Sequence, residues 1–201
     1  MGAEKIQIVE GRTLPLRGED MDTDRIMPAR FLKSITFEGL ETHVFEDDRL
    51  EASRSGRVHP FDEPKYQGAS ILVAQRNFGT GSSREHAPQG LRRWGIRAIV
   101  AESFAEIFFG NSLMIGLACV TASPSDVEKL MSLVERDPTA VLKVDLNTGL
   151  CEAPGMTVAV SIPTHVRDTL MTGAWDTTGL LLDKYEQVNA VSATLPYLSG
   201  F

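Results

Sequence analysis

The eight residues 79–86 read Gly-Thr-Gly-Ser-Ser-Arg-Glu-His, and this segment, here called the octet, combines two glycines with hydroxyl, guanidinium, carboxylate and imidazole groups. The apolar run 71–74 precedes it and a helix-like stretch follows, so we expect a strand-to-helix turn. Backbone amides at such a turn bind anions, helped by the helix dipole. Arginine binds carboxylates through two parallel hydrogen bonds. The octet therefore favours a carboxylate-binding active site over a plain turn in which Ser83 caps a helix.

Two other kinds of site fit the octet less well. A nucleotide phosphate loop would end in Lys followed by Ser or Thr, and a dinucleotide fold would need a third glycine. The second glycine of a serine hydrolase elbow is missing, and Arg84 follows the serines instead. Ser82 remains a candidate base or nucleophile if positive charge stabilises its ionised form. His86 is expected to point away on a helix and to be structural.

Two acids flank a threonine at Asp22-Thr23-Asp24, ahead of Arg25 and Pro28. Composition alone predicts a solvated turn with a capping aspartate. Two acids at this spacing bind a metal only with further ligands, and no histidine or third acid completes a set here. We therefore expect no metal site in this segment.

The bulk composition limits the partners of the chain. Its 201 residues are 42% hydrophobic and 23% charged, which is ordinary for a globular protein, and we expect one domain over residues 1–201. The net charge of −7 argues against nucleic acid and anionic membranes as partners. Five arginines nevertheless lie between Gln75 and Arg97, against the single acid Glu85, which indicates a small anionic ligand.

Cysteine content and hydropathy indicate the compartment and exclude one cofactor. No apolar run approaches the roughly 18 residues of a membrane helix, and the first residues lack a signal-peptide core. Cys119 and Cys151 stand apart in apolar or neutral surroundings, which is typical of reduced thiols in a cytoplasmic protein. An iron–sulfur cluster takes about four thiolates, so this chain is expected to hold none alone.

Strands and helices alternate through the middle of the chain. We expect strands at 71–74, 97–101 and 117–120, with helices at 85–94, 103–116 and 125–135. Before them we expect a strand over 6–9 ending in a Glu10-Gly11 turn, a polar loop over 20–28, a helix over 37–50 and a surface excursion over 54–68. After them we expect strands 140–146 and 156–162 flanking a turn at 147–149, then helices 163–171 and 177–189. This order predicts the α/β class, with a mixed sheet flanked by helices.

Three stretches together resemble the swivelling domain of the aconitase superfamily: residues 77–88 around the octet, residues 95–108 with Asn111-Ser112, and residues 22–28. The resemblance runs from about Gly18 to Val120. A free-standing chain of this length is similar to the small subunits of the isopropylmalate dehydratases within that superfamily. The resemblance implies a swivelling three-layer β/β/α domain with a C-terminal helical tail.

The same resemblance implies a hydro-lyase activity shared between two chains. The expected reaction is dehydration of 2-isopropylmalate and rehydration to 3-isopropylmalate, a step of leucine biosynthesis. A large subunit, in a heterodimer or heterotetramer with this chain, would carry a 4Fe–4S cluster. By resemblance, Ser82 is the base that removes the carbon-bound proton and Asp24 is an active-site aspartate near it. Ser83 and Arg84 would hold a carboxylate of the dicarboxylate substrate.

Substrate choice is expected to depend on residues 31–34, where aconitases place an arginine for a further carboxylate. This chain has Phe31, Leu32, Lys33 and Ser34 there. Phe31 and Leu32 suit an isopropyl group, whereas Lys33 would suit an extra carboxylate, as in homoaconitase. Isopropylmalate is the expected substrate. Homoaconitate, and substrates of the citraconate or dimethylmalate type, remain alternatives.

Overall fold

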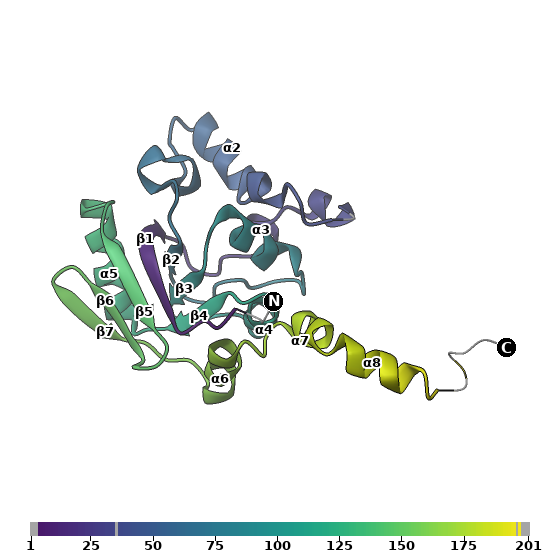
Figure 1. Cartoon of the computed structure of the whole chain (residues 1–201). Coiled ribbons are helices and arrows are strands. Elements are labelled where there is room, and N and C mark those ends of the chain that lie inside the picture. The colour runs from purple at the N-terminus through teal and green to yellow at the C-terminus, as the bar shows by residue number, and fades with distance from the viewer. Residues whose placement is uncertain (1–3, 35, 196, 198–201) are drawn as a thin grey trace.

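The computed structural model of the chain describes residues 4–34, 36–195 and 197 (Figure 1). Its strands are β1 (Ile8–Leu16), β2 (Ile71–Ala74), β3 (Ala98–Ala101), β4 (Ala118–Thr121), β5 (Val141–Asp145), β6 (Leu150–Ala153) and β7 (Met156–Ala159). Its α-helices are α1 (Thr23–Ile26), α2 (Glu46–Arg54), α3 (His86–Trp94), α4 (Glu106–Met114), α5 (Pro124–Arg136), α6 (Thr164–Thr172), α7 (Thr177–Asp183) and α8 (Tyr185–Ser192). Short 3-10 helices lie at η1 (Ala29–Lys33), η2 (Leu40–His43), η3 (Pro60–Asp62) and η4 (Pro64–Tyr66).

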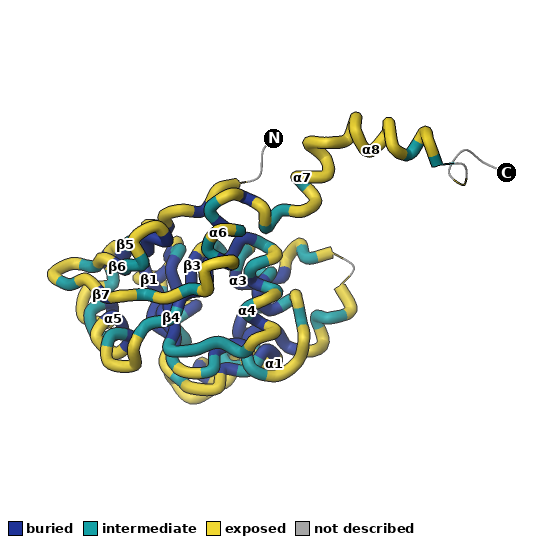
Figure 2. Tube along the Cα trace, turned by 90° about the horizontal axis from the view of Figure 1, so that it is seen from below, coloured by how far each residue is buried: buried dark blue, intermediate teal, exposed yellow. Residues whose placement is uncertain are grey.

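The strands form a mixed sheet in the order β4-β3-β2-β1-β5-β6-β7. Neighbours from β4 to β1 are parallel, and those from β1 to β7 are antiparallel. The apolar runs of β2 and β3 are buried throughout, because helices cover both faces of this part of the sheet. Helix α5 packs on β1 and β2, and Figures 1 and 2 show α3 and α4 on the opposite side. The predicted α/β class with a mixed sheet is confirmed.

Strand β1 is longer than the sequence predicted and joins the two halves of the sheet. It pairs with β2 in parallel and with β5 in antiparallel orientation. The turn predicted at Glu10-Gly11 is wrong, since Gly11 lies inside β1. Its missing side chain makes room for a neighbour, because a Cβ at Gly11 would lie 1.9 Å from Ser70 Oγ.

The segment between β1 and β2 differs most from its predictions. The loop predicted over 20–28 contains the short helix α1. The single helix predicted over 37–50 is wrong, because left-handed backbone at Gly39 (φ 85°) precedes η2 and left-handed backbone at Phe45 (φ 54°) separates η2 from α2. The segment 54–68 is not simply a surface excursion, since the rings of Phe61 and Tyr66 are buried in the core.

The C-terminal half of the sheet contains a strand that the sequence did not predict. The turn at 147–149 joins β5 to β6 rather than to the later strand, and a second turn then leads to β7. Asp145 fixes the first turn, since its Oδ1 accepts hydrogen bonds from the backbone N–H groups of Asn147 (2.8 Å) and Thr148 (3.3 Å). The predicted hairpin signal was correct, but its second strand was assigned too late in the sequence.

The segments that follow the parallel strands meet at one edge of the sheet. Phe78, after β2, forms a bridge with Phe104, after β3, and Asp22, after β1, forms one with Thr80. Ligands of open α/β sheets bind where the carboxyl ends of the strands meet. The fold therefore places the octet beside the Asp22–Asp24 segment.

Beyond α6 the chain leaves the body of the molecule as an arm made of α7 and α8 (Figure 1). The helix predicted over 163–171 is confirmed, and the one predicted over 177–189 is present but divided at Lys184. Within the described residues, none of the helices has the length and apolar character needed to cross a membrane.

Candidate active site

Backbone hydrogen bonds fasten the octet to the segment after β1. The carbonyl of Met21 accepts from the N–H groups of Gly79 (2.8 Å) and Thr80 (3.1 Å). The carbonyl of Thr80 accepts from Thr23 N–H at 2.7 Å. Residues nearly 60 positions apart in the sequence are thereby held in one rigid unit.

Thr23 continues this attachment with its side chain. Its Oγ1 accepts from the backbone N–H of Ser82 (3.1 Å) and donates to the carbonyl of the same residue (3.3 Å). Gly81 leaves room for the arrangement, since it has φ of +102° and a Cβ there would lie 2.6 Å from Asp22 Oδ2. The backbone of Ser82 is therefore fixed, while the residue itself is exposed to solvent.

Arg84 lies between an acid and the serine hydroxyl. Its Nη1 pairs with Asp24 Oδ1, and its Nη2 donates to Ser82 Oγ at 3.3 Å. The guanidinium side chain is 16% exposed and the Asp24 side chain 49% exposed. A guanidinium, a carboxylate and a hydroxyl thus form one cluster, here called the Ser82–Arg84–Asp24 triangle, at the surface of the molecule.

The helix that carries Asp24 is itself capped. Asp22 Oδ1 accepts from the backbone N–H of Asp24 at 2.5 Å and so caps α1. The predicted capping aspartate is confirmed, but the turn is not merely solvated, since Thr23 is 1% exposed. Sequence reasoning missed the role of Thr23, because nothing in a threonine between two acids indicates which distant backbone it will contact.

A cluster of aromatic side chains packs against the octet. Phe78 and Phe108 lie edge to face with ring centroids 5.2 Å apart, and Phe104 adjoins both rings. Gly79 (φ +81°) packs directly on this cluster, and a Cβ there would lie 2.1 Å from Phe108 Cγ. Ser112 is buried, and its hydroxyl donates to the carbonyl of Phe108 at 2.8 Å. The glycine loop therefore sits closely on α4.

The octet is an extended loop rather than a tight turn. Helix α3 begins at His86 with Glu85 at the N-cap position, so the interpretation of Ser83 as a helix cap is wrong. The helix predicted over 85–94 is confirmed, and Pro88 falls in its first turn, where no hydrogen bond is lost. His86 lies edge to face with Phe37, at 5.2 Å between ring centroids, as expected of a structural group.

The four residues predicted to select the substrate belong to η1 and its end, after Pro28. Phe31 stacks on His43 with ring centroids 3.8 Å apart. Phe31 and Leu32 are half-buried, whereas Lys33 and Ser34 are exposed. Among the described residues, no hydrogen bond joins these four to the triangle.

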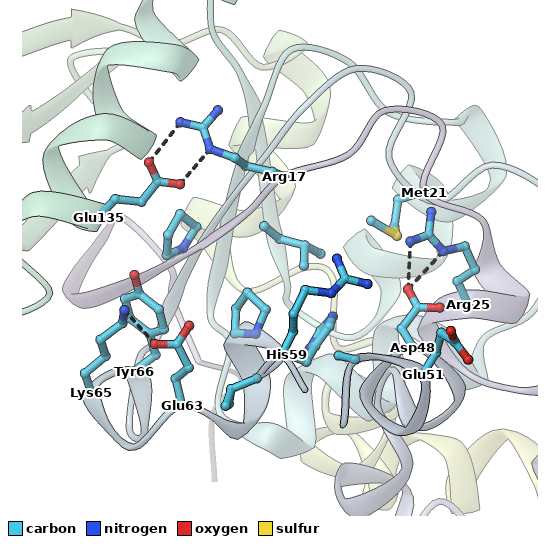
Figure 3. Close-up of a pocket in the computed structure, with 16 residues that line it drawn as sticks. Arg17, Met21, Arg25, Asp48, Glu51, His59, Glu63, Lys65, Tyr66 and Glu135 are labelled. Carbon is cyan, nitrogen blue, oxygen red and sulfur yellow. Dashed lines mark hydrogen bonds and ion pairs between the residues drawn. The ribbon is translucent and has the colours of Figure 1, made fainter. Parts of the chain in front are cut away.

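A cavity of about 560 Å³ lies outside the octet (Figure 3). Its charged lining is mostly paired within the protein: Arg17 binds Glu128 and Glu135, and Arg25 binds Asp48. Burial lowers the pKa of His59 in its wall and keeps that imidazole neutral. A cavity with compensated charges does not compete with the triangle as the centre of chemistry.

The chain does not fit an iron–sulfur cluster. Its two cysteines are buried on different strands, Cys119 in β4 and Cys151 in β6, and burial raises the pKa of each thiol to about 12. The described residues contain no group of three or more His, Cys, Asp or Glu side chains that could hold a metal ion. Neither thiol is therefore available as a thiolate ligand.

Known proteins resemble this chain over nearly its whole length. A family model described as the aconitase C-terminal domain matches residues 3–125. The 3-isopropylmalate dehydratase small subunits of Thermus thermophilus and of a Synechocystis species are 46% and 45% identical to it over 194 residues, with 96% of each chain covered. A crystal structure of 3-isopropylmalate dehydratase from Methanocaldococcus jannaschii superposes with a TM-score of 0.68 at 25% identity, covering 91% of this chain and 99% of that one. The chain therefore belongs to the 3-isopropylmalate dehydratase small-subunit family, a branch of the aconitase superfamily.

Proposed function

We propose that this chain supplies the base and the carboxylate clamp of a hydro-lyase that converts 2-isopropylmalate to 3-isopropylmalate by dehydration and rehydration, in leucine biosynthesis. The observation that carries the proposal is the contact of one guanidinium, Arg84, with both Ser82 Oγ and Asp24 Oδ1. The reaction needs a base for a carbon-bound proton and a cationic group for a carboxylate. This geometry offers both within one loop.

Ser82 would act as the base through its Oγ. A serine hydroxyl is far too weakly acidic to ionise unaided, so its alkoxide needs a fixed positive charge. The Arg84 Nη2 group at 3.3 Å provides that charge, and the bonds from Thr23 hold the backbone still. In dehydration the alkoxide would take the proton from one carbon as the hydroxyl group leaves its neighbour and the double bond forms. In rehydration a hydroxyl group would add to the first carbon while the Ser82 hydroxyl returns a proton to the neighbouring one.

Arg84 would also bind a carboxylate of the substrate, which would replace Asp24 as the partner of the guanidinium. In the free chain Asp24 occupies Nη1, which is the position that a substrate carboxylate needs for a two-point contact. The half-exposed Asp24 can turn toward water when the substrate binds. The hydroxyl of Ser83, on the next exposed residue, would donate to the same carboxylate.

The partner of this chain would be the large subunit, and together they would form the complete enzyme. Because the cysteines of this chain are buried on separate strands, we propose that the 4Fe–4S cluster of the reaction lies in that partner. The triangle lies at the surface, as a site completed by a second chain requires. Free thiols at Cys119 and Cys151 favour a cytoplasmic location, where they stay reduced.

The decisive experiment is co-expression of the chain with a cluster-bearing large subunit, followed by assay on 2-isopropylmalate. We expect Ser82→Ala to lower kcat by roughly 10²–10⁴-fold, the usual contribution of a general base. Ser53→Ala, an exposed serine on α2, is the matched control and should retain full activity. Activity of the small chain alone, or undiminished activity of Ser82→Ala in the complex, would contradict the proposal.

Substrate choice can be tested separately. The complex should prefer 2-isopropylmalate to homoaconitate, because Phe31 and Leu32 present apolar surface whereas Lys33 is solvated. Lys33→Ala should leave kcat/KM for 2-isopropylmalate within about twofold, as expected for an exposed surface substitution. A preference for homoaconitate that Lys33→Ala abolishes would assign the chain to that alternative instead.

A further inference from the structure

The arm formed by α7 and α8 carries a dense group of exposed apolar side chains. Thirteen large apolar side chains are exposed in the described part of the chain, and six of them lie on the arm. They are Leu180, Leu181, Leu182, Tyr185, Val188 and Val191. Figures 1 and 2 show the arm projecting from the body, with almost its whole length exposed. Apolar patches of this kind mark interaction sites.

The two helices of the arm lack support from the rest of the described chain. Helices α7 and α8 contain seven and eight residues, and neither has a buried residue. Isolated helices shorter than about 12–15 residues are marginal in water, and Gly179 weakens α7 further. Tyr185, Val188 and Val191 recur every three residues and so lie along one side of α8. A stable helical arm therefore requires a surface supplied by another molecule.

The root of the arm is nevertheless fixed to the body. Trp175 Nε1 donates to the carbonyl of Glu4 at 2.9 Å. The same indole packs on Gly116, where a Cβ would lie 2.7 Å from its ring. Asp176 caps α7 by accepting from Gly179 N–H at 2.8 Å. The arm thus leaves the molecule from a defined point, just beyond the end of α4.

Exposed apolar side chains continue from this root along α4 toward the octet. Helix α4 exposes Met114 (68%) at its end and Ile107 (49%) near its start, about 10 Å apart along the helix axis. On the same helix, Phe108 packs beneath Gly79 of the octet. Helix α4 therefore connects the octet, which packs on Phe108, with the root of the arm just beyond its end.

Charge and composition favour a different chain over a second copy as the occupant. Residues 176–195 contain three acids, Asp176, Asp183 and Glu186, against one base, Lys184. The whole chain carries a charge of −7, so two copies would repel each other at this surface. The relatives of the chain are small subunits, which implies a partner of another kind.

We propose that the arm docks into an apolar groove with a basic rim on the large subunit and holds the two chains together independently of the triangle. The proposal rests on the proposed function, because it takes the large subunit as the partner. The arm then provides affinity, while the octet provides chemistry. Tyr185 is the expected anchor, since buried aromatic residues contribute most of the binding energy at interfaces.

The test compares association and turnover in full-length chains. The triple variant Leu181→Gln, Tyr185→Gln, Val188→Gln removes the apolar side chains but keeps a residue that favours helices. We expect at least tenfold weaker binding to the large subunit in titration, equivalent to about 1.4 kcal/mol. At saturating concentrations of the variant, kcat should stay within twofold. The control is the double variant Leu50→Gln on α2 and Val141→Thr on β5, which replaces two exposed apolar side chains outside the arm. It should bind the large subunit as tightly as the wild-type chain.

The remaining outcomes are separable. Equal binding by the triple variant, with its thermal unfolding unchanged, would overturn the docking proposal while leaving the function intact. If light scattering shows that the free wild-type chain is a dimer and the triple variant a monomer, a second copy of the chain binds the arm. That result would also overturn the docking proposal. A wild-type complex that forms through the arm but does not act on 2-isopropylmalate would instead contradict the proposed function.

Discussion

Thr23 and Ser82 are joined by a reciprocal pair of hydrogen bonds between one side chain and one backbone. The N–H of Ser82 donates to Thr23 Oγ1 at 3.1 Å, and that hydroxyl donates to the Ser82 carbonyl at 3.3 Å. Thr23 is 1% exposed, so its hydroxyl acts from inside the protein on a residue at the surface. Both polar groups of the Ser82 backbone are thereby occupied, and the side chain remains available to Arg84.

The first prediction is that Thr23→Val lowers activity without unfolding the protein. Valine has almost the same shape as threonine but cannot hydrogen-bond, so Ser82 loses the contacts that position its Oγ. We expect kcat of the complex to fall about tenfold or more and KM to change little. The free energy of unfolding of the free chain should fall by about 1 kcal/mol in urea titration.

Thr23→Ser separates positioning from packing in the same experiment. Serine retains the hydroxyl and removes a methyl group, so most of kcat should return while a small stability deficit remains. If Thr23→Val and Thr23→Ser lose activity equally, the loss arises from packing, and the positioning role of the hydroxyl is wrong.

Arg84 provides the second prediction, because a lysine there retains charge but not shape. A single ammonium cannot reproduce the fork that contacts Ser82 Oγ and Asp24 together. We expect Arg84→Lys to lower kcat/KM by about 10²-fold in the complex, with effects on both kcat and KM because the side chain serves the base and the substrate. Arg93→Lys, on the exposed side of α3, is the matched control. Retention of both parameters in Arg84→Lys would remove Arg84 from the site.

The parallel part of the sheet could be predicted because its strands are continuous apolar runs. Residues 71–74 and 98–101 are buried on both faces, so composition alone identifies them. The turn predicted at Gly11 failed because the glycine there serves a close contact with Ser70, 59 residues away. The division of the helix predicted over 37–50 depends on left-handed backbone at Phe45, which sequence patterns do not reveal.

The candidate site was predictable in chemistry but not in assembly. The octet shows its arginine and serines directly, and the family resemblance indicated Asp24. No local pattern could pair Thr23 with Ser82, since that contact exists only after β1 and β2 lie side by side. The arm shows the converse limit: its helices were predicted from local preference, and only the fold shows that nothing in the described chain covers them.

The third prediction compares two glycines with nearly equal backbone angles. Gly79 and Gly68 have φ of +81° and +79°, but a Cβ at Gly79 would lie 2.1 Å from Phe108 whereas one at Gly68 meets nothing within 4 Å. Alanine at either position carries left-handed strain of about 1 kcal/mol. Gly79→Ala adds a clash of roughly 1–3 kcal/mol. Thermal unfolding of the two variants should differ accordingly, and Gly79→Ala should also lower kcat. Equal destabilisation would show that α4 yields to the added methyl group.

The fourth prediction concerns the pH dependence that His59 gives to the fold. Burial lowers the pKa of its imidazole below the usual 6.5, and the nearby Asp48 and Asp62 oppose this shift, while Arg49 and Arg25 add to it. Its Nδ1 also accepts from the backbone N–H of Phe61 at 3.3 Å, which protonation of that nitrogen would prevent. The unfolded chain therefore binds this proton more readily than the folded chain. Its contribution to stability is complete above pH 6.5 and is lost as the pH falls through the folded pKa.

Urea unfolding at pH 7.5 and 5.5 measures this contribution directly. Asparagine at position 59 retains a capping acceptor for Phe61 and does not titrate, so His59→Asn should lose less stability than the wild-type chain between the two pH values. His165→Asn, on the exposed surface of α6, is the control and should follow the wild type. The sign of the effect is diagnostic: a wild-type chain that gains stability relative to His59→Asn on acidification would mean that the folded state prefers the charged imidazole, with Asp48 and Asp62 outweighing burial.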